Sequence, residues 1–257
     1  MAKKIGVYVD SGSSFSTILR SLTQEVDSSY IVQAIIAEHL DRDNFFDDLD
    51  VFVMPGGADL PYCAKLNGSR NAALRNWVEQ GGIYLGLCAG AYYGCREIFF
   101  NGNYGEIKGS RELGFLKGSA IGSIPELAPL YDDTLKCAAV ASLVTDMGEV
   151  TASFYHGGPF FQIDSESKAI VLARYQTVKE NPPAIVECSV GDGKALLCGV
   201  HPEMSAKELK IRIRNIENSE LETEYSTRLL SALIKVESRR RKFWRMLLRR
   251  CGLKLCA

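Results

Sequence analysis

Short apolar runs alternate with longer amphipathic stretches in the first third of this chain, and this alternation restricts the fold more than any other feature. We interpret the runs as strands and the stretches between them as helices, with strands at residues 5–9, 30–36, 51–54 and 83–87. Strands that alternate with helices are typical of βαβ units, whose crossovers make a parallel sheet. The sequence therefore predicts a doubly wound α/β start.

The rest of the chain is expected to extend this sheet. In residues 101–164, Gly-rich turns separate short strand-like pieces, which predicts irregular strands and loops added to the core. Strands resume at residues 169–175, 184–189 and 195–200, and Gly191-Asp192-Gly193 between the last two favours an antiparallel hairpin. The predicted fold is a three-layer, mostly parallel α/β domain over residues 1–205. A helical extension, residues 206–257, is expected to dock on it.

The charge distribution separates the two ends of the chain. The 257 residues are 46% hydrophobic and 24% charged, as in ordinary globular proteins. Residues 238–257 carry eight Lys or Arg and no acid, which leaves 22 basic and 31 acidic residues in the remainder. Because no basic face is evident in this acidic body, we expect no nucleic-acid partner.

The basic C-terminal stretch has Trp244, Leu247, Leu248 and Cys251 at helical spacing, with basic residues largely opposite. A helix that docks its apolar stripe on the sheet explains the pattern, and contact with an anionic membrane or a protein partner is the alternative. The N-terminus shows no signal-peptide pattern and no apolar run reaches the roughly 20 residues that span a bilayer. We therefore expect a cytoplasmic protein with reduced cysteines. Because no C-x-x-C pair occurs, we do not expect a zinc site. We also expect no other metal and no cofactor.

Cys88 is the first residue that points to chemistry. It ends an apolar run within Gly86-Leu87-Cys88-Ala89-Gly90, and a helix is predicted after it over residues 89–99. A nucleophile between small residues at a strand-to-helix turn is the elbow pattern, and the helix N-terminus favours the thiolate. A buried structural cysteine is the alternative interpretation of the same five residues.

A thiol nucleophile needs a base, and the base needs an orienting group. His201 directly follows a predicted strand, and Glu203 lies two residues further on. Gly56-Gly57 follows the third strand, where bare backbone N–H groups can approach a ligand. We expect Cys88, His201 and Glu203 to act as nucleophile, base and orienting carboxylate. The N–H groups of Gly57 and Ala89 would hold the oxyanion.

These residues resemble those of a known family. The stretches Val53-Met54-Pro55-Gly56-Gly57, Gly86-Leu87-Cys88-Ala89-Gly90, Tyr155-His156-Gly157-Gly158-Pro159 and Gly199-Val200-His201-Pro202-Glu203 are similar to class I glutamine amidotransferases. They are more similar still to the amidotransferase-like N-terminal domain of biotin–protein ligases, which also occurs as a stand-alone bacterial protein. The resemblance implies a class I glutamine amidotransferase-like (flavodoxin-like) fold with the triad Cys88, His201 and Glu203.

Two departures limit what the resemblance implies. Glutamine amidotransferases usually carry Gln four residues after the nucleophile, and Tyr92 stands there in this chain. The chain also has no Gly-Arg-Gly-Arg adenylate loop, so we do not expect it to ligate biotin by itself. A thiol-dependent amidotransferase or hydrolase acting on a small amide or ester is the first hypothesis. A non-catalytic ligand-binding or regulatory module is the second.

Four further residues are candidates for substrate binding, namely Gly56, Asp59, Tyr92 and His156. Asp59 follows the Gly-Gly pair, and a loop-stabilising role is its alternative. His156 stands before two glycines that suit a tight loop beside a ligand, and a structural cap is its alternative. A small molecule is the expected partner in either hypothesis.

Overall fold

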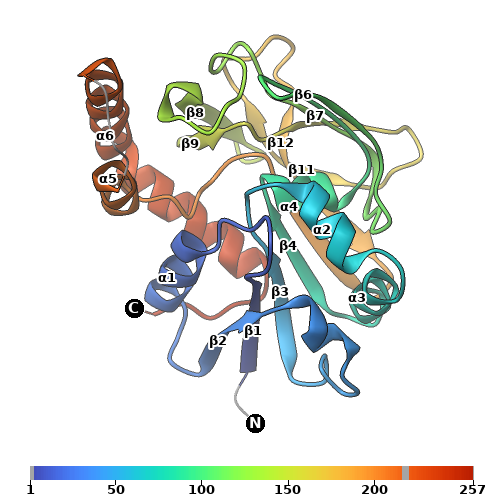
Figure 1. The fold of residues 1–257 in the computed structure, drawn as a ribbon. Helices are drawn as coiled ribbons and strands as arrows, with labels where there is room; N and C mark the ends of the chain where they lie inside the picture. The colour runs from blue at the N-terminus through green and yellow to red at the C-terminus, as the bar shows by residue number, and fades with distance from the viewer. Residues whose placement is uncertain (1–2, 216–219, 257) are drawn as a thin grey trace.

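A nine-stranded sheet forms the centre of the computed structural model, which describes residues 3–215 and 220–256 (Figure 1). Its strand order is β2-β1-β3-β4-β13-β12-β11-β8-β9. The first five strands in this order run parallel, and every pairing from β13 onward is antiparallel. The strands are β1 Lys3–Tyr8, β2 Tyr30–Ile35, β3 Leu49–Met54, β4 Ile83–Leu87, β8 Ala138–Thr145, β9 Val150–His156, β11 Ile170–Tyr175, β12 Pro183–Val190 and β13 Gly193–Cys198.

Helices cover both faces of this sheet, because its central strands are apolar on both sides. In β3, Val51 and Val53 face one core, whereas Phe52 and Met54 face the other. One face packs against α1 (Ser16–Glu25) and the C-terminal part of α6 (Glu220–Arg250). The other packs against α2 (Asp59–Leu66), α3 (Ser69–Glu79) and α4 (Ala89–Tyr93) (Figure 1). The three-layer α/β architecture predicted from the sequence is confirmed.

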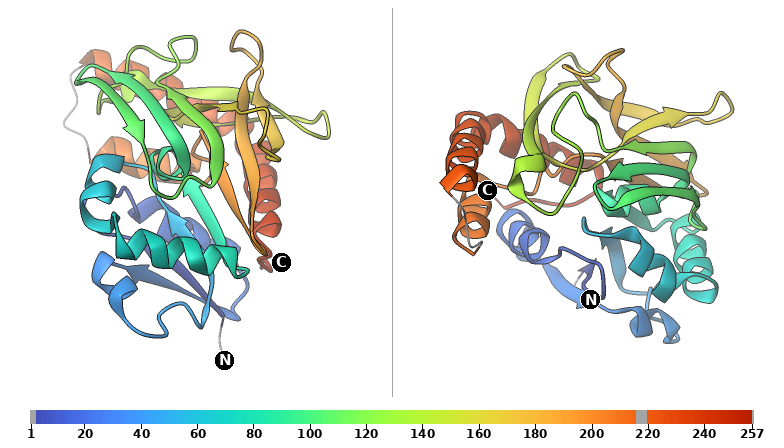
Figure 2. Two further views of the ribbon diagram at one scale, coloured as in Figure 1. Left: turned by 90° about the vertical axis from the view of Figure 1, so that its right-hand side faces the viewer. Right: turned by 45° about the horizontal axis from the view of Figure 1, so that its top comes forward.

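A second sheet of four strands lies beside α4. Its order is β10-β7-β5-β6, and its strands are β5 Cys95–Gly102, β6 Gly105–Ser110, β7 Leu116–Gly122 and β10 Phe160–Ile163. Figure 2 shows β5, β6 and β7 (green) curving over the upper part of the molecule. Residues from this sheet, among them Ile98 and Leu116, share a core with α4. The middle of the chain is therefore more regular than the irregular strands and loops expected for residues 101–164.

The helix predicted over residues 89–99 is wrong beyond Tyr93. Gly94 caps a five-residue α4, and its carbonyl accepts hydrogen bonds from the backbone N–H groups of Phe115 and Leu116. The chain then enters β5, which pairs with β6 and β7. Pairing across the second sheet outweighs local helix preference here, and Ile98, Phe99 and Phe100 suit a strand.

The C-terminal helices pack against the body of the protein. Trp244 and Leu247 of α6 are fully buried against the large sheet and α1. The N-terminal part of α6 packs with α5 (Ala206–Arg214) around Leu209, Leu229 and Leu233 (Figure 1). Basic side chains of α6 pair with acids of the body: Arg241 and Arg245 with Glu25, Lys242 with Glu149, and Arg250 with Glu187. Over the described ranges, none of the helices has the length and apolar character needed to cross a membrane.

The buried face of α6 leads to a stability prediction. Trp244→Ala removes a large side chain from the core and its indole hydrogen bond to the Ser21 hydroxyl. We expect the free energy of unfolding to fall by about 3–5 kcal/mol, as measured by urea denaturation. The matched control is Ile234→Ala at an exposed position of the same helix, which should cost less than about 0.5 kcal/mol. Equal effects of the two substitutions would contradict docking of the helix as part of the core.

Candidate active site

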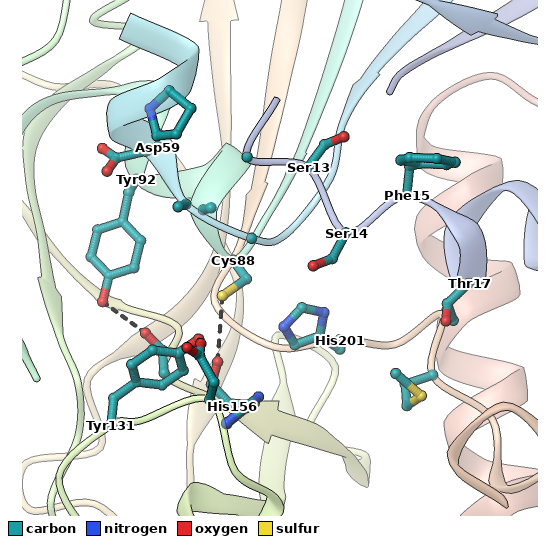
Figure 3. Close-up of a pocket in the computed structure, with 18 of the residues that line it drawn as sticks. Ser13, Ser14, Phe15, Thr17, Asp59, Cys88, Tyr92, Tyr131, His156 and His201 are labelled. Carbon is teal, nitrogen blue, oxygen red and sulfur yellow. Dashed lines mark hydrogen bonds between the residues drawn. The ribbon is translucent and has the colours of Figure 1, made fainter. Parts of the chain in front are cut away.

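The carboxyl ends of the parallel strands border a cavity of about 920 Å³. Three of these ends supply the residues singled out in the sequence: Gly57 follows β3, Cys88 follows β4, and His201 follows β13. The β1–α1 loop adds Ser13 and Ser14 (Figure 3). The predicted nucleophile, base and oxyanion donors therefore lie in one cavity.

Cys88 sits at a strained turn between β4 and α4. Its φ of 49° and ψ of −104° lie outside the regions that a non-glycine residue prefers. The turn is tight, since a Cβ on Gly90 would lie 2.1 Å from the Met54 carbonyl oxygen. The Cys88 sulfur is almost buried and lies 3.5 Å from the His156 carbonyl oxygen (Figure 3).

His201 and Glu203 form a buried pair next to this thiol. Nδ1 of His201 lies 2.8 Å from Oε1 of Glu203, and the His201 backbone N–H donates to the Phe154 carbonyl. Burial by itself lowers the pKa of His201, but the negative charges of Glu203 and Cys88 outweigh it and raise that pKa to about 10. The imidazole is therefore positively charged at neutral pH, and it also forms a side-chain hydrogen bond with Cys88.

Gly56 allows the His201 ring and the Cys88 side chain to lie close together. A Cβ at this position would lie 2.6 Å from Cε1 of His201 and 3.4 Å from Cβ of Cys88. The missing side chain therefore leaves the space that the imidazole occupies. The hydroxyl of Tyr62 lies 3.0 Å from the Gly56 carbonyl oxygen and 3.2 Å from the Pro55 carbonyl oxygen. These contacts help to hold the Pro55-Gly56 turn in place.

The two predicted oxyanion donors are available. Gly57 has a φ of 129°, and a Cβ there would lie 1.9 Å from the Gly12 carbonyl oxygen, so only glycine fits. Among the hydrogen bonds of residues 3–215 and 220–256, none uses the backbone N–H of Gly57 or of Ala89. Both residues line the cavity, so both N–H groups can serve a ligand.

Comparison with known proteins shows the family to which the chain belongs. The family model described as biotin-protein ligase, N terminal, matches residues 3–257. The chain belongs to this family. It is 32% identical over 241 residues to the biotin–protein ligase of Schizosaccharomyces pombe; the match covers 90% of this chain but 37% of that protein. It is also 32% identical over 194 residues to an uncharacterized protein of Chlamydia muridarum, covering 72% of this chain and 75% of the relative.

Solved structures agree with the fold. A glutamine amidotransferase crystal structure superimposes with a TM-score of 0.54 at 19% identity, covering 77% of this chain and 90% of that one. The structure of PurLQS from Thermotoga maritima gives a TM-score of 0.54 at 15% identity, and the match covers 91% of this chain and 99% of that one. The fold of this member of the biotin–protein ligase N-terminal family is therefore glutamine amidotransferase-like, as predicted. The chain spans little more than a third of the yeast ligase that it matches.

His156 contributes its backbone and its ring in different ways. Its carbonyl oxygen lies 3.5 Å from the Cys88 sulfur, and its Nε2 lies 3.0 Å from the Asp132 carbonyl oxygen. Because a carbonyl only accepts, Nε2 carries the proton and Nδ1 is the acceptor that faces Nη2 of Arg212, 3.4 Å away. Burial, with the positive charges of Arg212 and His201, lowers the pKa of His156 to about 4. The ring is therefore neutral at pH 7 and lines the cavity.

Tyr92 and Asp59 both hold loops in place. The Tyr92 hydroxyl donates to the Gly157 carbonyl, with the two oxygens 3.1 Å apart, so this side chain ties α4 to the loop after His156 (Figure 3). The buried carboxylate of Asp59 accepts from Nε of Arg111 at 2.8 Å. Both side chains also line the cavity, so the two interpretations weighed for Asp59 are both compatible with its position.

Sequence reasoning missed Arg212 and the hydroxyl-bearing start of α1. Arg212 lies on α5 and lines the cavity. Ser14 and Thr17 line it too (Figure 3). No spacing in the sequence connects α5 with the strand ends, and the Ser14–Thr17 segment has only its place after β1 as a signal. Asp10, at the end of β1, serves the backbone instead, because its carboxylate accepts from the N–H groups of Ser11 and Ala37.

The two cavity histidines should titrate in opposite directions. We expect NMR of ¹³C-labelled histidine to show His201 protonated at pH 7–8 and His156 neutral down to about pH 5. Glu203→Gln removes the carboxylate that raises the His201 pKa, so His201 should become neutral at pH 7 while His156 is unchanged. A neutral His201 in the unmodified protein at pH 7 would contradict the ion pair.

The role of Gly56 can be tested by a double-mutant cycle. Gly56→Ala places a methyl group against the His201 ring, and we expect it to lower the free energy of unfolding by about 1–3 kcal/mol in urea denaturation. In a His201→Ala background the ring is gone, so the same substitution should cost less than half as much. Equal costs in both backgrounds would show that the imidazole is not what the glycine accommodates.

Proposed function

We propose that this protein is a cysteine-dependent amidotransferase or hydrolase that acts on a small amide or ester. The observation that carries the proposal is the Cys88 thiol at a strained turn, in one cavity with the His201–Glu203 pair. Nucleophile, base and orienting carboxylate are the three parts that acyl transfer by a thiol requires. The cavity volume of about 920 Å³ suits a small molecule.

The reaction proposed has two halves. The Cys88 sulfur attacks the substrate carbonyl carbon, forming a C–S bond, while the thiol proton resides on His201. The N–H groups of Gly57 and Ala89 stabilise the oxyanion, and His201 gives its proton to the departing amine or alcohol as the C–N or C–O bond breaks. Water then attacks the thioester, with His201 taking its proton, and the acid leaves as the thiol forms again.

Glu203 acts through His201 in this scheme. The carboxylate fixes Nδ1–H of the ring, so that the opposite nitrogen faces the sulfur. Its charge also stabilises the protonated form of the His201 ring. A cytoplasmic location stays our expectation, and the free thiols of all eight cysteines are compatible with it.

Labelling of the cysteines tests the proposal. Iodoacetamide at pH 6–7, with mass spectrometry of each cysteine, should modify Cys88 in preference to Cys63, whose thiol pKa is raised by burial. The preference should disappear in His201→Ala. With p-nitrophenyl acetate, the acetyl group should appear on Cys88, and the rate should fall about a hundredfold or more in Cys88→Ser or His201→Ala. Cys63→Ser, outside the cavity, is the matched control and should leave the rate unchanged.

A non-catalytic binding module is the second candidate function, and Tyr92 favours it. Its hydroxyl is engaged with Gly157, at the position where glutamine amidotransferases usually carry Gln. The same labelling experiment separates the two functions. If Cys88 reacts no faster than Cys63 and accepts no acetyl group, the cavity binds a ligand without acylation at Cys88.

A further inference from the structure

The segment from His201 to Ala206 carries the imidazole and the carboxylate of the site, and it links β13 to α5. Residues 202–205 belong to neither a strand nor a helix, so contacts with neighbouring elements must fix their backbone. The sheet holds the first residue, because the His201 N–H donates to the Phe154 carbonyl of β9 at 2.8 Å. The rest of the segment is held from α6.

Arg240 and Glu237 form a two-point ion pair on α6, three positions apart. Nε and Nη2 of Arg240 lie 3.0 and 2.7 Å from Oε2 and Oε1 of Glu237. The Arg240 side chain is only 3% exposed. A bidentate pair of this kind fixes the plane of the guanidinium as well as its position. The Arg240–Glu237 pair is therefore a rigid group of donors and acceptors inside the protein.

Both members of the pair also bind the backbone of the 201–206 segment. Nη1 of Arg240 donates to the carbonyl of Pro202, which is buried and needs a partner inside the protein. Oε2 of Glu237 accepts from the N–H of Ala206 at 3.1 Å, which is one of the free N–H groups at the start of α5. These two contacts lie on either side of Glu203, one residue before it and three residues after it.

We propose that Arg240 is a positioning residue of the site, which together with Glu237 fixes the backbone of Glu203 so that its carboxylate stays against Nδ1 of His201. This inference rests on the proposed function for the role of His201 as the base. Neither Arg240 nor Glu237 lines the cavity, so both act through the segment and not on a ligand. A displacement of about 1 Å would end the 2.8 Å hydrogen bond between Glu203 and His201.

The charge state of His201 distinguishes positioning from a direct effect of the Arg240 charge. Release of the segment moves Glu203 away from the ring and removes the negative charge that raises the His201 pKa, so this pKa should fall. Loss of a positive charge near the ring would act in the opposite direction and raise the pKa. The other titratable groups that interact with His201 are Cys88 and His156, which lie on other elements and keep their places in the test.

Arg240→Met in the full chain is the test. NMR titration of ¹³C-labelled histidine should show the His201 pKa, which is about 10 in the unmodified protein, lowered by about one pH unit or more. The pKa of His156 should stay at about 4. Acetylation of Cys88 by p-nitrophenyl acetate should slow about 10- to 100-fold, because a displaced base is a poor catalyst. Arg240→Lys keeps a donor for the Pro202 carbonyl and should recover at least about half of the lost His201 pKa shift.

Arg245→Met is the matched control. Arg245 is also a largely buried arginine of α6, and it also binds a glutamate and a backbone carbonyl, those of Glu25 and Cys256. Its partners lie outside the 201–206 segment. The substitution removes the same kinds of bond, so its effect on the free energy of unfolding should be similar. It should leave the His201 pKa and the acetylation rate unchanged.

Glu237→Gln keeps the test decisive if Arg240→Met does not fold. Gln has the same size and can still accept from Ala206, but it offers Arg240 one oxygen in place of two. The His201 pKa should fall in this variant too, by less than in Arg240→Met.

An unchanged or raised His201 pKa in Arg240→Met overturns the inference, as it does in Glu237→Gln where only that variant folds. An equal fall in Arg245→Met also overturns it, because the effect would then be a general loosening of α6. The proposed function is tested separately by the unmodified protein. If Cys88 of that protein accepts no acetyl group, the proposed function fails, whereas a lowered His201 pKa in Arg240→Met still shows that Arg240 positions the His201–Glu203 pair.

Discussion

Close backbone contact at the carboxyl edge of the sheet is the constraint on which the whole site depends. The turn after β3 must pass within contact distance of the β1–α1 loop, of α4 and of the His201 ring at the same time. Gly56, Gly57 and Gly90 make this possible, because a Cβ on any of them would meet another atom at 2.6 Å or less. A side chain at any of these glycines would push apart the segments that hold the thiol, the imidazole and the N–H donors.

At the same edge of the sheet, two histidines differ in charge at neutral pH: His201 is protonated and His156 is neutral. His201 and His156 both lie in the cavity, and burial lowers the pKa of each. Glu203 and Cys88 supply negative charge next to His201 and reverse the effect, whereas His156 faces the positive charge of Arg212. The cavity is therefore divided into a side suited to proton transfer and a side that presents a fixed cation.

The sequence contained enough information for these strands and for the residues that follow them at the cavity, since both depend on local pattern. Predicted strands 51–54 and 83–87 agree with β3 and β4 within two residues, and each is followed by a residue of the cavity. The helix predicted over 89–99 is wrong because Gly94 and pairing with β7 end it at Tyr93. With five residues, α4 can align few peptide dipoles next to Cys88.

Arg212 could not be predicted from the sequence, because its position depends on how α5 packs against the body through Leu209 and through the Arg20–Glu208 pair. The cavity therefore takes its polar groups from two separate parts of the chain. Strand ends supply the Cys88 thiol and the His201 imidazole, and the helical part after residue 205 supplies the Arg212 guanidinium. The Tyr92 hydroxyl is already engaged by the Gly157 carbonyl. The C-terminal helices are therefore part of the site, since without α5 the cavity would lose both Arg212 and the acid that Arg20 restrains.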